Sequence, residues 1–226
     1  MNIKLITWKI VGIKPLIQSN PHEMWKDENG DDGDEVVVSK GRKALRGTDQ
    51  QNFTLCQKQL YINEEGKHYH PAVGFMKNLE MACDQRQLGK KNALTIVSSA
   101  VALVDHEFFL YDPTTLGAKV SKLVEGNEWQ IDYRRAVNHN KNKTDGGVGV
   151  VAIRPKWKQW GGFVTLEVDM DFFAGVEGLT ELMNVGGHYY GIGVGRKRVK
   201  AIVRQKPEWS DMLMGRYSAE LMNGQS

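Results

Sequence analysis

The sequence predicts an α+β protein with a ferredoxin-like (RRM-like) βαββαβ core, a long insertion after the first strand and a protruding basic β-hairpin. Three observations predict this fold. The chain begins with a segment of β-branched and aromatic residues over 4–11. Two later segments, 71–83 and 174–184, carry apolar residues at helical spacing, and each lies between strand-like segments. A length of 226 residues, 41% of them hydrophobic, suffices for one substantial core, so we expect a single domain over 1–226.

The first connection carries an insertion over 20–52 in which no sustained period appears. A calcium-binding loop would need glycine at its sixth position and glutamate at its twelfth, where this chain has Asp32 and Val38. The insertion is therefore predicted to be a charged loop that binds no metal. Its first half is acidic and its second half is basic. Its charged residues are Asp27, Glu28, Asp31, Asp32, Asp34 and Glu35, followed by Lys40, Arg42, Lys43 and Arg46.

The middle of the chain continues with short elements. A helix is predicted over 71–83, because a proline at its start suits the first helical position and apolar residues recur along the segment. Short apolar runs predict strands at 60–62, 94–97 and 101–110. These elements complete the first βαβ unit.

The second half predicts a long hairpin and a second βαβ unit. Segments 128–133 and 149–154 are typical of hairpin arms, and 161–170 is typical of a further strand. After the 174–184 helix, alternation over 199–203 predicts the closing strand. The tail, 207–226, is predicted to be helical, because it carries a one-sided apolar set of Trp209, Met212, Leu213, Tyr217 and Leu221.

Five glycines fall within ten residues between the second helix and the closing strand, and three cations follow at once. Dinucleotide and P-loop sites have the reverse order, because their phosphate binds at the N-terminus of the helix that follows the loop. We therefore predict no cofactor. A loop without side chains, edged by cations, suits a nucleic-acid backbone approaching the main chain; a helix C-cap followed by a turn is the alternative. The residues are Gly186, Gly187, Gly191, Gly193, Gly195, Arg196, Lys197 and Arg198.

The distribution of charge is more informative than the modest net charge of +3. Over 134–158, the predicted basic hairpin, seven cations stand against the single carboxylate of Asp145, and Trp157 and Trp160 lie at its end. Cations interleaved with aromatic rings grip phosphates and stack on bases. Because tryptophan is usually buried, at least one of the two is expected in the core. The predicted nucleic-acid-binding residues are Arg134, Arg135, His139, Lys141, Lys143, Lys156, Trp157, Lys158, Gly191, Gly193, Gly195, Arg196, Lys197 and Arg198; an unstructured charged loop is the alternative.

Cysteine content and the N-terminal segment bear on the compartment. Cys56 and Cys83 form neither a disulfide framework nor a metal-ligand spacing, which fits a reducing environment. The N-terminal apolar residues are interrupted by lysines and precede no small-residue cleavage site. We therefore expect a cytoplasmic protein with no membrane partner.

Together these features resemble the RAMP superfamily, the repeat-associated proteins that build CRISPR effector complexes. The resemblance rests on the glycine-rich loop over 186–195 with its cations, and on a G-x-x-x-x-P motif before the first helix, from Gly66 to Pro71, followed by Lys77. It implies an RNA-binding backbone subunit that coats a single strand in multiple copies. The implied partners are single-stranded RNA or DNA, further copies of the chain and other subunits of a ribonucleoprotein. Similar proteins occur in phages and mobile elements, so a stand-alone relative is the other form of this resemblance.

Two alternatives to a binding role stay open. In RAMP endoribonucleases a histidine near the first helix can act as general base, and His68 and His70 occupy such a place. Because alternate residues of an extended segment share a face, these histidines would offer two metal ligands at most, so the implied enzyme is a metal-independent endoribonuclease. The second alternative is a structural subunit of a larger assembly whose basic surface meets an acidic protein.

Overall fold

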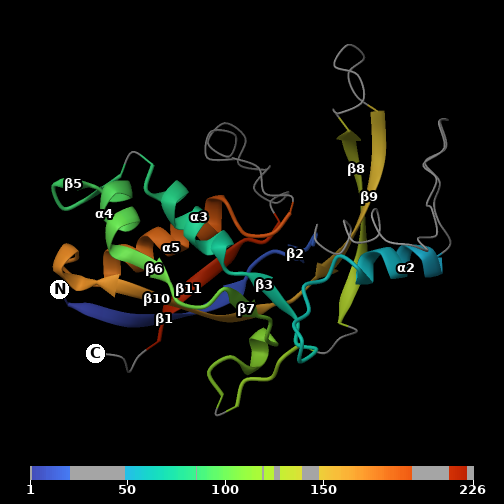
Figure 1. Cartoon of the computed structure of the whole chain (residues 1–226), viewed down its shortest axis with the longest axis horizontal. Coiled ribbons are helices and arrows are strands. Elements are labelled where there is room, and N and C mark those ends of the chain that lie inside the picture. Colours follow the sequence, from blue (N-terminus) through green and yellow to red (C-terminus); the bar gives the residue numbers. More distant parts are fainter. Residues whose placement is uncertain are drawn as a thin grey trace.

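The protein is an α+β structure built from antiparallel sheets with helices packed against them (Figure 1). None of the helices described is long and apolar enough to cross a membrane. The computed structural model describes residues 2–20, 49–84, 86–118, 120–124, 128–138, 148–194 and 214–222.

The main sheet has four strands in the order β11–β1–β10–β6, and all three neighbouring pairs are antiparallel. The strands are β1 (Ile3–Gly12), β6 (Val101–Leu103), β10 (Gly161–Asp169) and β11 (Tyr217–Leu221). Strand β1 confirms the strand predicted at the start of the chain. Strand β11 lies in the tail, 207–226, and corrects the helix that was predicted there. The predicted closing strand at 199–203 lies outside the described residues.

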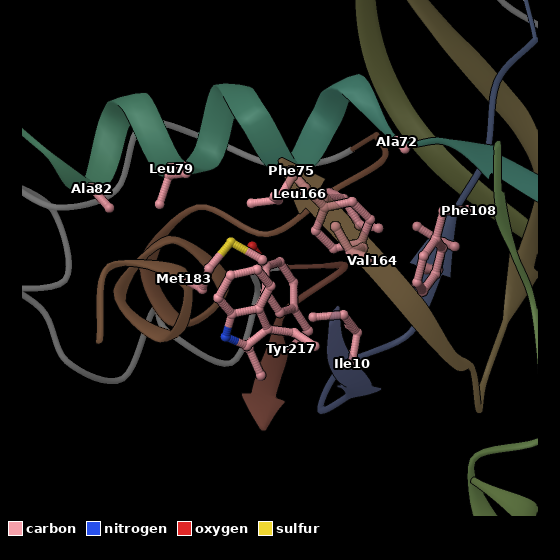
Figure 2. Packing of buried hydrophobic residues seen from close by; sticks show 14 of the residues in the cluster. Ile10, Ala72, Phe75, Leu79, Ala82, Phe108, Val164, Leu166, Met183 and Tyr217 are labelled. Atoms are coloured by element: carbon pink, nitrogen blue, oxygen red, sulfur yellow. The ribbon is translucent and has the colours of Figure 1, made fainter. Parts of the chain in front are cut away.

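Three helices cover one face of this sheet: α3 (Val73–Ala82), α4 (Ala93–Ala100) and α5 (Glu177–Tyr189) (Figure 1). Strand β1 alternates, so its even-numbered residues point to the helices while its odd-numbered residues face outward. Trp8 is one of the inward residues, and its indole N–H donates a hydrogen bond to the Thr180 hydroxyl of α5 at 2.8 Å. Figure 2 shows the resulting core, in which the helices meet the sheet through Ile10, Phe75, Leu79, Val164, Leu166, Met183 and Tyr217.

Helix α4 corrects the predicted strand at 94–97. The Asn92 side chain caps the helix by accepting a hydrogen bond from the Leu94 N–H at 2.9 Å. The buried residues Ala93, Ile96, Val97 and Ala100 follow the i, i+3, i+4, i+7 spacing of a helix face. A run of apolar residues this short fits both periods, and the asparagine cap decides between them.

The predicted strand at 101–110 is two strands, β6 and β7 (Glu107–Phe109). Strand β7 pairs with β3 (Tyr69–Pro71), so Pro71 ends a strand rather than starting α3. The predicted strand at 60–62 contributes only a single bridge, between Ile62 and His68. The remaining short elements are β4 (Gln87–Leu88), β5 (Lys91–Asn92), the 3-10 turn η1 (Pro113–Thr115) and the 3-10 turn η2 (Met170–Phe172).

The predicted hairpin is confirmed and is longer than expected. Strands β8 (Trp129–Asn138) and β9 (Val148–Trp157) pair over their whole length and extend beyond the body of the protein (Figure 1). Helix α2 (Asp49–Gln57), which starts inside the predicted insertion, packs against the hairpin. The Phe53 ring of α2 stacks on Trp129 with a centroid separation of 4.9 Å. Residues 21–48 of the insertion lie outside the described residues.

Helix α5 extends further than the predicted 174–184 and contains two of the five clustered glycines. A Cβ atom on Gly186 would lie 2.9 Å from the Asn78 carbonyl oxygen of α3, and one on Gly187 would overlap the Tyr217 carbonyl oxygen of β11. These glycines therefore allow the helix to approach both neighbours closely. One turn earlier, the Asn184 side chain donates to the Ala219 carbonyl (2.9 Å) and accepts from the Ala219 N–H (2.8 Å).

Candidate nucleic-acid interface

The two predicted basic segments join the body of the protein on opposite sides of one short strand, β2 (Leu16–Ile17). We call the described residues at each junction, Lys156 for the hairpin and Val194 for the loop, the root of that segment. On one side, Ile17 is in register with Lys156 near the end of β9. On the other side, the Ile17 carbonyl accepts a hydrogen bond from the Val194 N–H at 2.9 Å. Val194 is the last described residue before segment 195–213, which contains the predicted basic loop. The structure therefore brings the root of the hairpin and the root of this loop together, although about 40 residues of sequence separate them.

The two ends of the 195–213 segment are held beside each other. The Ile192 N–H donates to the Gly215 carbonyl at 2.9 Å, and the Gly215 N–H donates to the Pro15 carbonyl at 2.7 Å. The segment thus leaves and returns at one point on the body, next to β2. Its root is fixed by main-chain hydrogen bonds, which are independent of the residues within the segment.

Gly191 and Gly193 are required by packing within the chain, and their predicted role at a nucleic-acid interface stays a prediction. Both have left-handed backbone angles, with φ of 65° and 78°. A Cβ atom on Gly191 would lie 2.7 Å from the Met214 carbonyl oxygen, and one on Gly193 would lie 2.5 Å from the Ile17 carbonyl oxygen. Their missing side chains make room for the protein's own backbone. Gly191 also follows the end of α5, so the alternative of a C-cap glycine is correct for this position.

Trp157, which was predicted to contact nucleic acid, is a core residue in the structure. The side chain is completely buried. Its indole N–H donates to the Gln18 Oε1 atom at 3.2 Å, and the His68 ring packs edge-on against it at 5.0 Å. Trp160 is equally buried, and its N–H donates to the Lys14 carbonyl at 2.8 Å. Neither ring is exposed for stacking on a base in this structure.

The described cations of the hairpin differ in their surroundings. The Lys156 Nζ atom lies 3.2 Å from the Asp132 Oδ1 atom, so part of its charge is balanced within the protein. Lys158 is exposed just beyond β9. Arg134 and Arg135 lie in the outer half of β8. The other predicted contacts lie outside the described residues and stay predictions: His139, Lys141, Lys143, Gly195, Arg196, Lys197 and Arg198.

The structure adds an aromatic residue that the sequence analysis missed. Tyr133 stands on β8 next to Arg134 and is 50% exposed. Its hydroxyl accepts a hydrogen bond from the Asn52 Nδ2 atom of α2 at 3.3 Å, which holds the ring in place. An exposed aromatic ring is the kind of side chain on which bases stack in single-strand-binding proteins. The signal in the sequence was a tyrosine directly before two arginines.

Arg216 is a second residue that the sequence analysis missed, at the point where the chain returns from segment 195–213. The side chain is buried, and its Nη2 atom lies 2.6 Å from the Nδ1 atom of His188 at the end of α5. Burial, and then the charge of Arg216, lower the pKa of His188. A shallow pocket of about 360 Å³ adjoins this pair and is lined by Ile13, Glu181, Asn184, Val185, His188, Tyr189, Tyr217 and Ser218. Within the described part of the chain, no group of three His, Cys, Asp or Glu residues is placed to hold a metal ion.

The candidate catalytic histidines, His68 and His70, are core residues in the structure. His68 and His70 do share one face of an extended segment, but that face points into the protein, and both side chains are buried. The His70 ring packs edge-on against Tyr61 with a centroid separation of 5.7 Å. Burial lowers the pKa of His68, so its imidazole is neutral near pH 7. Neither ring is accessible to a ribose hydroxyl, which a general base must contact.

We expect His68 to make the protein less stable in mild acid. Because the pKa of His68 is lower in the folded than in the unfolded protein, the unfolded state binds the extra proton below about pH 6.5. Stability is therefore complete above that pH and falls as the pH decreases, by at most about 1.4 kcal/mol per pH unit for one group. Urea denaturation between about pH 7.5 and about pH 5.5 should show a smaller loss in His68→Gln than in the wild type. His106→Gln, which removes an exposed ring, is the matched control; an equal loss in wild type and His68→Gln would contradict the prediction.

Comparisons with known proteins find similarity among solved structures. No protein-family model matches the chain, and no curated protein matches it. Among solved structures, the chain is similar to one in a cryo-EM structure of the Type III-B Cmr-beta complex bound to cognate target RNA, with a TM-score of 0.49 and 10% sequence identity. The alignment covers 98% of this chain and 61% of that chain, so the protein spans about three fifths of its neighbour's length.

Proposed function

We propose that the protein binds single-stranded nucleic acid, with RNA as the polymer, and acts as a RAMP-like backbone subunit that coats the strand in multiple copies. The observation that carries the proposal is the position of β2 between the roots of the hairpin and of segment 195–213. A strand bound there can contact both basic segments at once, so their phosphate contacts act together.

The order of the main sheet supports a ferredoxin-like core. The four strands β1, β6, β10 and β11 are connected by α3 and α4 in the first unit and by α5 in the second. The first strand lies between the third and the fourth, and all neighbours are antiparallel. This is the arrangement of two interleaved βαβ units. The hairpin then stands as an insertion between the two units, where the RAMP resemblance implies a protruding element.

The charge distribution supports a polyanionic ligand. Segment 195–206 contains six cations and no carboxylate, and 134–158 contains seven cations and one carboxylate. Segments with so large an excess of one sign attract phosphates along their length. The half-exposed ring of Tyr133 on β8 is the aromatic side chain that we propose stacks on a base.

Removing the cations after α5 should weaken binding in a way that depends on salt. We expect the triple variant Arg196→Ala, Lys197→Ala, Arg198→Ala to bind an oligouridine with lower affinity. The plot of log affinity against log salt should become shallower by about 2, because each phosphate contact on a single strand contributes about 0.7. Fluorescence anisotropy at several salt concentrations measures both quantities.

A matched control separates this effect from a change in total charge. The triple variant Lys4→Ala, Lys90→Ala, Lys122→Ala removes three exposed cations that lie outside β2 and the two basic segments. It should keep the wild-type salt dependence. If both triple variants change the slope equally, the proposed interface is wrong.

Coating in multiple copies further requires that the amount of protein bound at saturation rises with oligonucleotide length.

A further inference from the structure

Helix α2, which lies beside the hairpin (Figure 1), holds two exposed aromatic rings. Phe53 of α2 is 42% exposed, and Tyr133 of β8 is 50% exposed. The Phe53 ring stacks on Trp129 of β8 with a centroid separation of 4.9 Å and an interplanar angle of 22°. The neighbouring Asn52 donates a hydrogen bond from its Nδ2 atom to the Tyr133 hydroxyl at 3.3 Å. These two contacts join α2 directly to β8, and we refer to Asn52, Phe53, Trp129 and Tyr133 as the α2–β8 aromatic site.

The Phe53 ring has one covered face and one open face. Trp129, which is itself buried, lies against one face of the ring in the offset-stacked arrangement that aromatic pairs favour. The exposed area of Phe53 therefore belongs to its opposite face and its edge. A planar ligand placed on that face would continue the stack above Phe53 and Trp129. Because Trp129 already fixes the ring, a ligand would lose little free energy in ordering it.

The Tyr133 ring is fixed in a different way. Its hydroxyl is bonded to Asn52, whose side chain is buried, so the bond anchors the ring to α2. Alternate residues of a strand share a face, so Tyr133 and Trp129 lie on the same face of β8, about 13 Å apart at about 3.3 Å per residue. Phe53, which covers Trp129, and Tyr133 therefore present two separate flat surfaces along the hairpin.

The charge next to the site indicates which ligand the rings take. The chain continues from Tyr133 into Arg134 and Arg135, and segment 134–158 carries seven cations and one carboxylate. Phosphates fit these cations and the flat faces of bases fit the two rings, which is the combination found in single-strand-binding proteins. Bases within a duplex are already stacked on their neighbours and have no free face to offer. The combination thus favours an unpaired strand.

We propose that the α2–β8 aromatic site takes two bases of the bound strand, one on Phe53 and one on Tyr133, so that α2 forms part of the interface. The inference rests on the proposed function and extends it from the phosphates to the bases. Every base has a flat face, so the site discriminates unpaired from paired strands and does not select one base over another.

The experiment compares oligoadenylate with an abasic oligonucleotide of the same length, by fluorescence anisotropy. Phe53→Leu and Tyr133→Leu each remove one ring and keep an apolar side chain. Each should weaken the binding of oligoadenylate at least about fivefold, the smaller contribution of one stacked base. The slope of log affinity against log salt should stay unchanged, because no phosphate contact is lost. On the abasic oligonucleotide both variants should bind as the wild type does.

Phe172→Leu is the matched control for the loss of an exposed ring. Phe172 is 44% exposed and lies on η2, outside the hairpin and α2. This variant should bind both oligonucleotides as the wild type does. A loss of affinity for oligoadenylate equal to that of Phe53→Leu would contradict the assignment of the bases to the α2–β8 aromatic site.

The wild type alone provides a second test, which needs no variant to fold. A duplex carries the phosphates of two strands over the same length, so charge alone would favour the duplex. The wild type should instead bind oligoadenylate more tightly than the duplex that oligoadenylate forms with oligouridine. Equal or tighter binding of the duplex would overturn the inference.

The remaining outcomes separate this inference from the proposed function. If the wild type binds oligoadenylate and neither leucine variant binds it more weakly, while circular dichroism shows both folded, the base contacts are wrong and the phosphate contacts stand. An equal loss of affinity on the abasic oligonucleotide has the same meaning, since no base is present there. If the wild type binds no single strand at all, the proposed function is itself wrong, and this inference with it.

Discussion

Trp157→Ala is expected to lower the free energy of unfolding by about 3–5 kcal/mol, the usual cost of deleting a large aromatic side chain from a core. The ring is completely buried at the root of β9 and packs against His68. Its loss also leaves the Gln18 Oε1 atom without the indole N–H, although the Gln18 Nε2 atom still donates to the Tyr69 carbonyl at 2.6 Å. Urea denaturation followed by circular dichroism measures the change.

Two further variants separate this structural role from nucleic-acid binding. Trp157→Phe keeps an aromatic ring in the core and should bind an oligouridine as the wild type does. Lys158→Ala changes the exposed neighbour, so stability should stay within about 0.5 kcal/mol of the wild type while affinity falls. A loss of affinity in Trp157→Phe at unchanged stability would show that the ring meets a base after all.

Gly215→Ala is the second variant with a large expected effect. Gly215 has a φ of 66°, which costs an alanine about 1–2 kcal/mol. A Cβ atom there would also overlap the Ile192 carbonyl oxygen, a main-chain atom that can move only if the hydrogen bond between these residues is rebuilt. Overpacking of this kind adds about 1–3 kcal/mol. We therefore expect a loss of about 2–5 kcal/mol, measured by urea denaturation.

Gly89→Ala is the matched control, because it isolates the backbone cost. Gly89 has nearly the same φ, 63°, but nothing lies within 4 Å of the position of its Cβ atom. We expect it to lose only about 1–2 kcal/mol. An equal loss of free energy of unfolding in the two variants would contradict the close packing of Gly215 against Ile192.

Local patterns predicted the elements whose evidence lies within one segment. Strand β1, helix α3, the β8–β9 hairpin and strand β10 all appear at their predicted places. Helix α4 was missed although Asn92 and the buried face that begins at Ala93 carried the helical signal, because a short apolar run was assigned by composition alone. Strand β11 was missed because the tyrosine and leucine at its ends also fit a helical stripe, and only pairing with β1 selects the strand.

The candidate site depended on contacts that the sequence does not contain. Five clustered glycines favoured a ligand loop, yet the atoms that require Gly186 and Gly187 belong to Asn78 and Tyr217, far away in the chain. Trp157 was assigned to the interface because cations surround it in sequence, whereas Leu16, Gln18 and His68 lie next to it in space. Charge and order along the chain thus predict a candidate region, while tertiary packing decides which of its residues are accessible.

The amide of Asn184 has a consequence for how the protein can aggregate. It occupies the N–H and C=O of Ala219, at the centre of the outer edge of β11, where a strand from another molecule would otherwise pair. An edge strand protected in this way cannot extend the sheet into a continuous fibre. Contact between molecules at this edge is therefore left to side chains, and Asn184→Ala should increase fibre formation in concentrated samples.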